Sequence, residues 1–168
     1  MTSILKVDNI QTSGGTSALE IDSTGRILTP ARPSFSATLT TQFSTSSTSA
    51  KVTGWTENFD TGNCWDNANS KFVAPVTGLY QLNYTGLHSS GAAGTTNYVR
   101  AQLRVNGSNI VDGLGDKGSY GNYQRVTILA AWELTANDEV EIYASSNQSS
   151  GFVYANNKYT VFSGYLVG

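Results

Sequence analysis

One continuous stretch of the chain, residues 71–84, constrains the fold more than any other. It reads Lys-Phe-Val-Ala-Pro-Val-Thr-Gly-Leu-Tyr-Gln-Leu-Asn-Tyr. Proline has no N–H to donate to a β-sheet and pushes the residue before it to extended geometry, so Pro75 indicates the start of a strand. Gly78 permits a bulge or a close backbone approach. The alternation beyond it predicts a half-buried strand with one core-facing side. That side carries Tyr80, Leu82 and Tyr84.

The same two-residue alternation recurs at short intervals. Residues 98–105 place Val, Ala, Leu and Val on one face, and Asn106-Gly107 after them is the strongest short signal for a hairpin. Residues 126–134 and 140–144 alternate in the same way across a turn at Asn137-Asp138. No segment has a convincing helical period, and only 13% of the residues are charged. The chain is therefore predicted to be all-β, a sandwich of the Greek-key or jelly-roll type.

Two closely spaced prolines, in Pro30-Ala31-Arg32-Pro33, predict a stiff joint between two parts of the chain. Residues 1–32, the leader, form short β-like runs but hold too few apolar side chains to close a core. The leader must pack on the main domain (33–168), a neighbouring subunit or a larger assembly, and the stiff joint disfavours the first. We predict that it serves in attachment or trimerisation. Its candidate contacts are Ile4, Leu5, Val7, Ile10, Leu19 and Ile21.

The last predicted strand, residues 159–167, is apolar on both faces. Phe162 and Leu166 lie on one face. An antiparallel strand at a free surface should be polar on one side, so we predict that another subunit covers this strand, with cover by a loop of the same chain as the alternative. The subunit contact would use the second face. That face carries Tyr159, Val161, Tyr165 and Val167.

Composition excludes several classes of partner. The formal net charge of -2 and the pI near 5.2 leave no basic surface for nucleic acid or anionic lipid. No long apolar run or secretion signal occurs, so membrane insertion is not expected. Cys64 is the only cysteine, which excludes an intrachain disulfide. We expect the protein to fold in a cytoplasm and, if it acts outside a cell, to leave by host lysis.

Catalytic and metal-binding patterns are weak. The single histidine, His88, precedes a polar loop, where a histidine is usually solvated, and no Gly-x-Ser-x-Gly sequence occurs. Most acidic residues fall in apparent turns, where Asp is expected for local hydrogen bonding. Asp112 and Asp116 are the best calcium candidates, but their spacing is not that of an EF-hand and the turn interpretation is preferred. The sequence predicts no enzyme, no cofactor and no metal site.

Two predicted loops combine aromatic and amide side chains, as carbohydrate-binding surfaces do. Sugars present apolar C–H faces ringed by hydroxyls, so exposed aromatic rings beside Asn suit them, although edge or core packing explains such residues equally well. Binding functions concentrate in loops held by a rigid scaffold. The candidate receptor contacts are Tyr120, Asn122, Tyr123, Tyr154 and Asn156. Trp55 is a further candidate, whereas Trp65 is assigned to packing.

From Pro33 onward the chain resembles the globular heads of the complement C1q family, which are related to the tumour necrosis factor jelly rolls. The matching pieces occur in the family's order and include residues 71–80, 103–107 and 161–166. Leu82 and the turn at Asn137-Asp138 depart from the family's pattern without threatening the fold. The resemblance implies a ten-stranded jelly roll that associates as a tight homotrimer, with the final strand close to the three-fold axis.

The leader resembles those of marine phage and cyanophage virion proteins. It contains residues 6–10 (Lys-Val-Asp-Asn-Ile), 14–19 (Gly-Gly-Thr-Ser-Ala-Leu) and 21–25 (Ile-Asp-Ser-Thr-Gly), and no collagen-like glycine repeat. The resemblance implies a virion structural protein whose leader binds other virion proteins. Its trimeric head would contact a host-surface glycan or protein, as a tail fibre does. The alternatives are a capsid decoration, cement or head-fibre protein and, remotely, a glycan-active enzyme.

Overall fold

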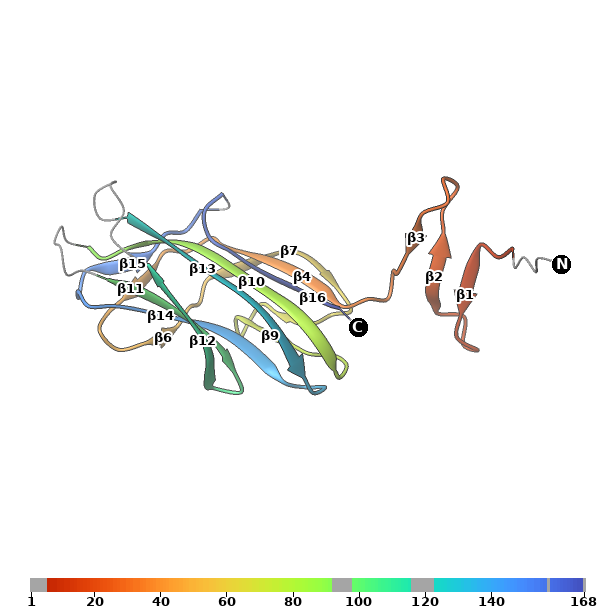
Figure 1. The fold of residues 1–168 in the computed structure, drawn as a ribbon. Coiled ribbons are helices and arrows are strands. Elements are labelled where there is room, and N and C mark those ends of the chain that lie inside the picture. The colour runs from red at the N-terminus through yellow and green to blue at the C-terminus, as the bar shows by residue number, and fades with distance from the viewer. Residues whose placement is uncertain (1–5, 92–97, 116–122, 157, 168) are drawn as a thin grey trace.

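The chain folds into a small sheet and a β-sandwich joined by an extended linker (Figure 1). The computed structural model describes residues 6–91, 98–115, 123–156 and 158–167. Every regular element in these ranges is a β-strand, so the predicted all-β class is confirmed. The described residues accordingly form no helix with the length and apolarity needed to cross a membrane.

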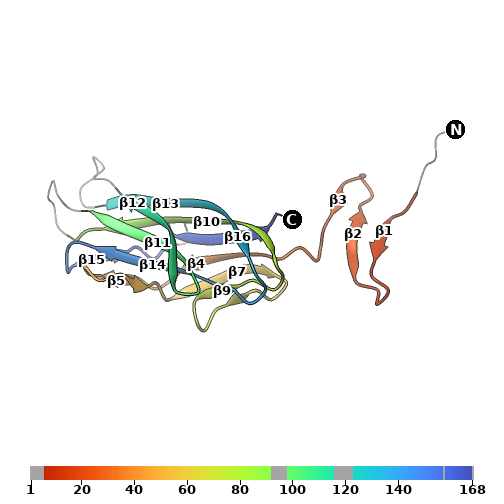
Figure 2. The ribbon, with the colours of Figure 1, turned by 60° about the horizontal axis from the view of Figure 1, so that its bottom comes forward.

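The leader forms an antiparallel sheet of its own, in the order β1 (Asn9–Gln11), β2 (Ser17–Ile21) and β3 (Ile27–Leu28). Figures 1 and 2 show this sheet beyond the end of the sandwich where the C-terminus lies. The carboxylate of Asp22 organises the turn between β2 and β3. It accepts the backbone N–H groups of Thr24 and Arg26, and the Arg26 Nε–H at 2.6 Å. These hydrogen bonds lower the pKa of Asp22 to about 2.

The sandwich consists of two sheets in which all the pairings are antiparallel. The β10 sheet runs in the order β5 (Phe43–Thr45), β15 (Gly151–Val153), β10 (Gly78–Ser89), β16 (Val161–Leu166), β4 (Ser34–Leu39), β7 (Trp55–Thr61), with β13 (Tyr123–Leu134) on the other side of β10. The β11 sheet runs in the order β12 (Ser108–Gly115), β11 (Val99–Val105), β14 (Glu139–Ser146), β9 (Lys71–Val73), β8 (Trp65–Asp66), with β6 (Ala50–Lys51) pairing to β14.

The described strands of these two sheets number seven and six, more than the ten that the family resemblance implies. The excess comes from pieces of two or three residues that pair with the ends of longer strands, such as β6 beside β14 and β15 beside β10. The long strands carry the architecture, since β10 and β13 each span 12 residues and pair over their whole length.

The stretch at residues 71–84 is two strands in different sheets rather than one strand. β9 ends at Val73 in the β11 sheet, and β10 starts at Gly78 in the β10 sheet. Pro75 therefore lies in the crossing between the sheets, where its missing N–H costs no ladder hydrogen bond. A bulge was one of two alternatives for Gly78, and it is absent, since Gly78 pairs in regular register with Leu134.

Aromatic side chains form the centre of the core. Phe35 on β4 stacks on Phe72 of β9 at a centroid distance of 4.7 Å and meets Phe162 of β16 edge-on at 5.0 Å, so it joins both sheets. The side predicted to face the core is buried, with Tyr80, Leu82 and Tyr84 all at most 1% exposed. Burying each such side chain contributes roughly 1.5–3 kcal/mol.

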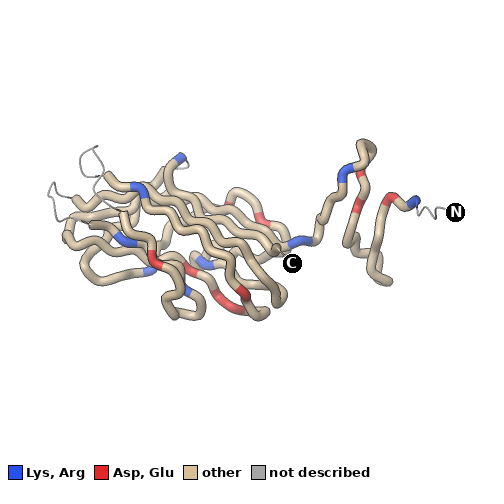
Figure 3. Tube along the Cα trace, viewed as in Figure 1, with Lys and Arg blue, Asp and Glu red and all other residues tan. Residues whose placement is uncertain are grey.

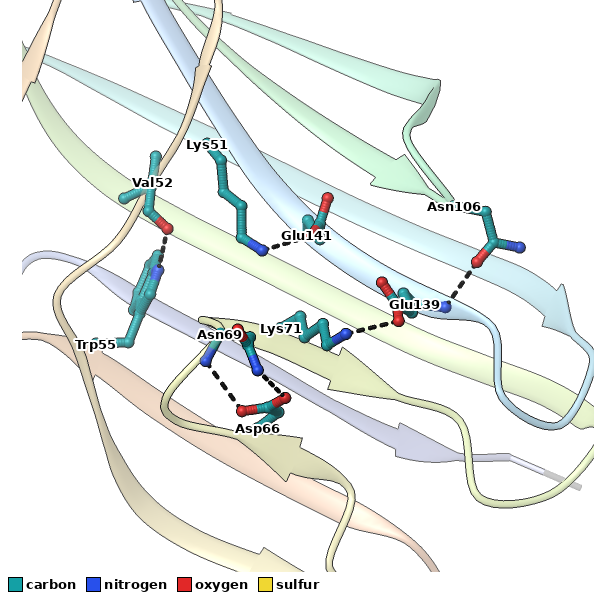
Figure 4. Close-up of polar contacts among 9 residues, drawn as sticks. All are labelled: Lys51, Val52, Trp55, Asp66, Asn69, Lys71, Asn106, Glu139 and Glu141. Atoms are coloured by element: carbon teal, nitrogen blue, oxygen red, sulfur yellow. Dashed lines mark hydrogen bonds and ion pairs between the residues drawn. The ribbon is translucent and has the colours of Figure 1, made fainter.

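The two tryptophans singled out in the sequence are both buried. Trp65 packs in the core, as assigned. Trp55 is also buried, and its Nε1–H donates to the Val52 carbonyl at 2.9 Å (Figure 4). The interpretation of Trp55 as a surface platform is therefore wrong, because its ring closes the edge of the core.

Asparagine supplies the turns at the end of the sandwich near the leader. Asn106 (φ 50°) and Gly107 (φ 78°) form the predicted hairpin between β11 and β12. Asn137 (φ 75°) adopts the same left-handed geometry between β13 and β14. The side-chain oxygen of Asn106 accepts the N–H of Glu139 at 2.9 Å, which ties the two turns together (Figure 4).

Candidate functional site

The outward face of the β10 sheet carries exposed apolar side chains on three neighbouring strands. Register places Tyr165 of β16 beside Gln81 of β10, and Leu129 of β13 beside Asn83 of β10. Because side chains alternate along a strand, these residues point away from the core. Leu129 is 71% exposed and Tyr165 is 44% exposed. We call this surface the apolar face. It comprises Leu79, Leu129, Val161, Tyr165 and Val167.

Four aromatic rings extend this face towards the end of the sandwich away from the leader. Tyr123 and Phe152 lie on either side of Ser89 on β10, which is buried between them, and their ring centroids are 6.2 Å apart. Tyr154 is 6.2 Å from Tyr123 and 6.0 Å from Tyr159. We call Tyr123, Phe152, Tyr154 and Tyr159 the aromatic cluster. Segments far apart in the sequence thus bring aromatic and apolar side chains to the same outward side of the β10 sheet, with polar residues such as Gln81 and Asn83 between them.

The structure brings together residues that the sequence assigned to two separate roles. Tyr123 and Tyr154 were predicted receptor contacts, and Tyr159 was a predicted subunit contact, yet all three belong to the aromatic cluster. Tyr159 precedes β16 and was wrongly placed within that strand. Asn156 is occupied in the turn, where its side-chain oxygen accepts the Lys158 N–H at 2.9 Å. Tyr120, Asn122 and Asp116 lie outside the described residues.

The outward face of the β11 sheet has the opposite chemistry. Arg100 binds Asp112 through two hydrogen bonds, Nε to Oδ1 at 2.8 Å and Nη2 to Oδ2 at 2.6 Å. Gln102 accepts from Arg104 at 2.7 Å, and the Arg104 guanidinium lies 3.9 Å from the centroid of the Tyr143 ring. Figure 4 shows two further ion pairs on this side, between Lys51 and Glu141 and between Lys71 and Glu139. This face is a network of paired polar groups.

The sequence and the fold together decide the family. A family model described as the C1q domain matches residues 34–167, which span the whole sandwich. The chain belongs to the C1q domain family. The described part of this C1q domain carries charged residues of both signs, and the acidic residues Glu133, Asp138, Glu139 and Glu141 follow one another without a Lys or Arg between them (Figure 3).

Solved structures share the fold of this chain. The globular domain of zebrafish complement 1qA matches with a TM-score of 0.62 and 20% identity, covering 82% of this chain and 98% of that one. Murine APRIL matches with a TM-score of 0.61 and 12% identity, covering 81% and 99%. The Eiger TNF of S. frugiperda matches with a TM-score of 0.63 and 8% identity, covering 82% and 94%. At these identities the likenesses show a C1q/TNF-like jelly-roll fold. No curated protein sequence matches the chain.

The calcium candidate Asp112 is committed to other partners in this C1q domain. Besides the two bonds from Arg100, its carboxylate accepts the Gln102 amide at 3.1 Å and the Asn109 amide at 3.1 Å. The hydrogen bonds from Arg100 come first among the causes that lower the pKa of Asp112. It also lies within β12 rather than in a turn. Among the described residues, no three His, Cys, Asp or Glu side chains converge as a metal site would require.

His88 and Cys64, the two side chains with catalytic potential, are both buried. His88 lies in β10, not in a loop, and its Nε2 is 2.6 Å from the Tyr84 hydroxyl. Burial lowers the pKa of His88 to about 3 and raises that of Tyr84. Burial also raises the pKa of the Cys64 thiol, whose Sγ is 3.0 Å from Asp60 Oδ1. Neither group can meet a substrate from solution, and the prediction of a solvated His88 was wrong.

Sequence reasoning missed three members of the outward surface, Leu79, Leu129 and Phe152. Leu129 occupies a polar position in the alternation of β13, between the core residues Ile128 and Ala130, and this departure was the available signal. Trp132 was assigned to the core face but is 40% exposed, although Ala130 and Leu134 on either side of it in the alternation are buried. Phe152 gave no comparable signal, since β15 is only three residues long.

Proposed function

We propose that this C1q domain protein is a non-enzymatic structural protein of a phage virion. Three heads associate through the apolar face and the aromatic cluster of the β10 sheet, and the trimer contacts the host surface as a tail-fibre-like protein. The observation that carries the proposal is the difference between the two outward faces. The charged side chains Arg100 and Asp112 on the β11 sheet are paired, and Leu114 is the exposed large apolar residue in its described strands; the β10 sheet exposes Leu79, Leu129 and Tyr165 on three neighbouring strands.

Association of the β10 sheets follows from the hydrophobic effect. Removing apolar surface from water stabilises a complex by about 25 cal/mol per Å². Several large apolar side chains exposed on one face are typical of a protein that buries this face against another copy. In the trimers that the resemblance to C1q heads implies, the final strand lies close to the three-fold axis, and this supports a contact through β16, which carries Tyr165.

The leader supplies the second half of the proposal, attachment to the particle. Ile10 and Leu19 pair across β1 and β2, and Ile21 pairs with Ile27 across β2 and β3, so one side of the small sheet is apolar. With Val7 they line a pocket of about 150 Å³. Two members of the predicted contact set, Ile4 and Leu5, lie outside the described residues. A three-stranded sheet with no second layer cannot bury this side by itself, so another virion protein is its expected partner.

The apolar side of the leader also favours a second candidate function, that of a capsid decoration or cement protein. In that role the leader threads between capsid subunits and the head has no receptor. Both candidate functions require the leader, so they differ only in what the head binds.

The discriminating experiment uses the full chain and a phage that lacks its gene. For an adhesin, the purified protein adsorbs to host cells and inhibits infection, and the mutant phage adsorbs poorly with capsids of normal strength. For a cement protein, adsorption is normal and the mutant capsids break under heat or low salt. Turnover of a host glycan by the purified protein would favour the enzyme alternative.

A further inference from the structure

Association through the β10 sheet leaves the β11 sheet as the broad surface that a trimer presents outward. In the described part of that sheet, two large apolar side chains stay exposed. Leu114 on β12 is 64% exposed, and Tyr98, directly before β11, is 47% exposed. An exposed aromatic ring close to an exposed leucine forms a surface that a ligand with an apolar face can cover.

A groove joins these two side chains. It has a volume of about 340 Å³ and is lined by Tyr98, Arg100, Asp112 and Leu114. Arg100 pairs with Leu114 across β11 and β12, so the guanidinium lies beside the exposed leucine. The bidentate contact with Asp112 holds that guanidinium in one plane. The groove therefore presents the fixed guanidinium plane of Arg100 between the side chains of Tyr98 and Leu114.

Arg100 retains N–H groups that can donate hydrogen bonds to a ligand in the groove. A guanidinium has five N–H donors, and Asp112 takes two of them. Asp112 itself accepts four hydrogen bonds, from Arg100, Gln102 and Asn109, so it positions Arg100 rather than binding a ligand. The positive charge of Arg100 is compensated by Asp112 at 2.6 Å, which leaves the groove without a net charge to attract an anion.

We propose that this groove binds one ring of a neutral saccharide on the host surface. The apolar C–H face of a pyranose packs on Tyr98 and Leu114, and its hydroxyl and ring oxygens accept the remaining N–H groups of Arg100. This inference rests on the proposed trimer and its adhesive role, because it requires the β11 sheet to face outward. The proposed receptor contact thus lies on the β11 sheet, whereas the sequence predicted it at Tyr123 and Tyr154.

In a trimer, a groove with weak affinity for a single sugar is sufficient for adhesion. A single sugar ring in a shallow groove is expected to bind with a Kd on the order of millimolar. Three grooves on one particle-bound trimer engage a polymeric glycan together, and linked sites gain roughly 100- to 10,000-fold in avidity where the spacing allows it. A repeating surface polysaccharide fits this arrangement better than an isolated sugar.

The test is saturation-transfer NMR on the full-length protein. The probes are the methyl glycosides of glucose, galactose, mannose and N-acetylglucosamine, with glucuronic acid as the charged comparison. We expect transfer to at least one neutral probe, and a loss of affinity of roughly tenfold in Leu114→Ser and in Tyr98→Ser. Both side chains are exposed, so neither variant threatens the core. Val76→Ser, which removes an exposed apolar side chain from a turn outside the groove, should bind as the unchanged protein does.

Three outcomes overturn the saccharide site: no transfer to any neutral probe, binding of glucuronic acid alone, or unchanged affinity in Leu114→Ser and Tyr98→Ser. Sedimentation of the same samples reports the trimer independently. Adsorption to host cells distinguishes the two proposals. If these variants adsorb normally, the adhesive function stands and the groove does not; if the unchanged protein fails to adsorb, the adhesive function falls.

Discussion

At the scale of single residues, Gly86 is the most constrained position in β10. A Cβ at Gly86 would lie 2.1 Å from the Tyr84 hydroxyl and 2.9 Å from His88 Nε2. The side chains at positions 84 and 88 share the inward face with Gly86, and their hydrogen bond passes over its backbone. Sequence reasoning selected Gly78 rather than Gly86. A hydrogen bond between the side chains two residues before and two residues after a glycine produces no recognisable sequence pattern.

Gly86→Ala should therefore destabilise the head. The added methyl overpacks the site, at about 1–3 kcal/mol. It also separates Tyr84 from His88, which leaves buried polar groups unpaired at about 1–3 kcal/mol more. Urea unfolding at fixed protein concentration measures the loss. Gly14→Ala is the control, since a Cβ there meets only Thr12 Oγ1 at 3.8 Å. Equal stability of the two variants would contradict the packing described for β10.

His88 should make stability depend on pH. Its pKa falls from 6.5 in the unfolded chain to about 3 in the fold, so between these values the unfolded chain binds a proton that the native state does not. Stability is fully present above pH 6.5 and declines by up to about 1.4 kcal/mol per pH unit as the pH falls towards 3. The chain has one histidine, so between pH 6.5 and 5 the slope reports His88.

His88→Gln provides the comparison, because glutamine does not titrate. Urea midpoints at pH 7.5, 6.5, 5.5 and 5 should fall for the unchanged protein and stay level for the variant. A slope that persists in the variant would show that His88 is not its source.

At the scale of elements, the sequence predicts the positions of the strands well, but it predicts poorly which strands pair with one another. Alternation correctly identified β11, β13 and β14, and the turn residues identified the hairpin at Asn106. The same pattern could not divide residues 71–84 between two sheets, because alternation reports burial of a face and not the sheet to which it belongs. Alternation also does not report which strands are neighbours. The sequence therefore assigned the subunit contacts and the receptor contacts to different surfaces, although the register across β10 places them on one surface.

The leader offers a test at this scale. Ile27→Asp puts a charge on the apolar side of the small sheet, where Ile27 is 70% exposed and pairs with Ile21. The charge would have to be buried in the particle without a partner, so incorporation into virions should fall while the head still folds. Ala18→Asp, on the opposite side of β2, is the matched control. Incorporation is read by quantifying the protein in purified particles, and equal amounts for both variants would contradict attachment through this side.

At the scale of the whole molecule, we propose a different role for each part. In this proposal the β10 sheet joins heads through apolar contacts, the β11 sheet faces outward, and the leader connects the trimer to the particle. Apolar association is screened little by salt. The trimer should therefore persist from low salt to about 1 M NaCl in sedimentation velocity runs, and dissociation on adding salt would indicate that charges hold it together instead.

We propose that heads associate through the outward face of the β10 sheet. Sedimentation velocity at micromolar concentration on Leu129→Asp and Leu114→Asp tests this association. Both leucines are largely exposed in the single chain, at 71% and 64%, so neither change should unfold the head. Burying an unpaired carboxylate at position 129 in three subunits costs several kcal/mol per subunit by order of magnitude. We predict a trimer for the unchanged protein and for Leu114→Asp, and a monomer for Leu129→Asp. A monomeric unchanged protein, or a trimer in Leu129→Asp, would contradict the claim.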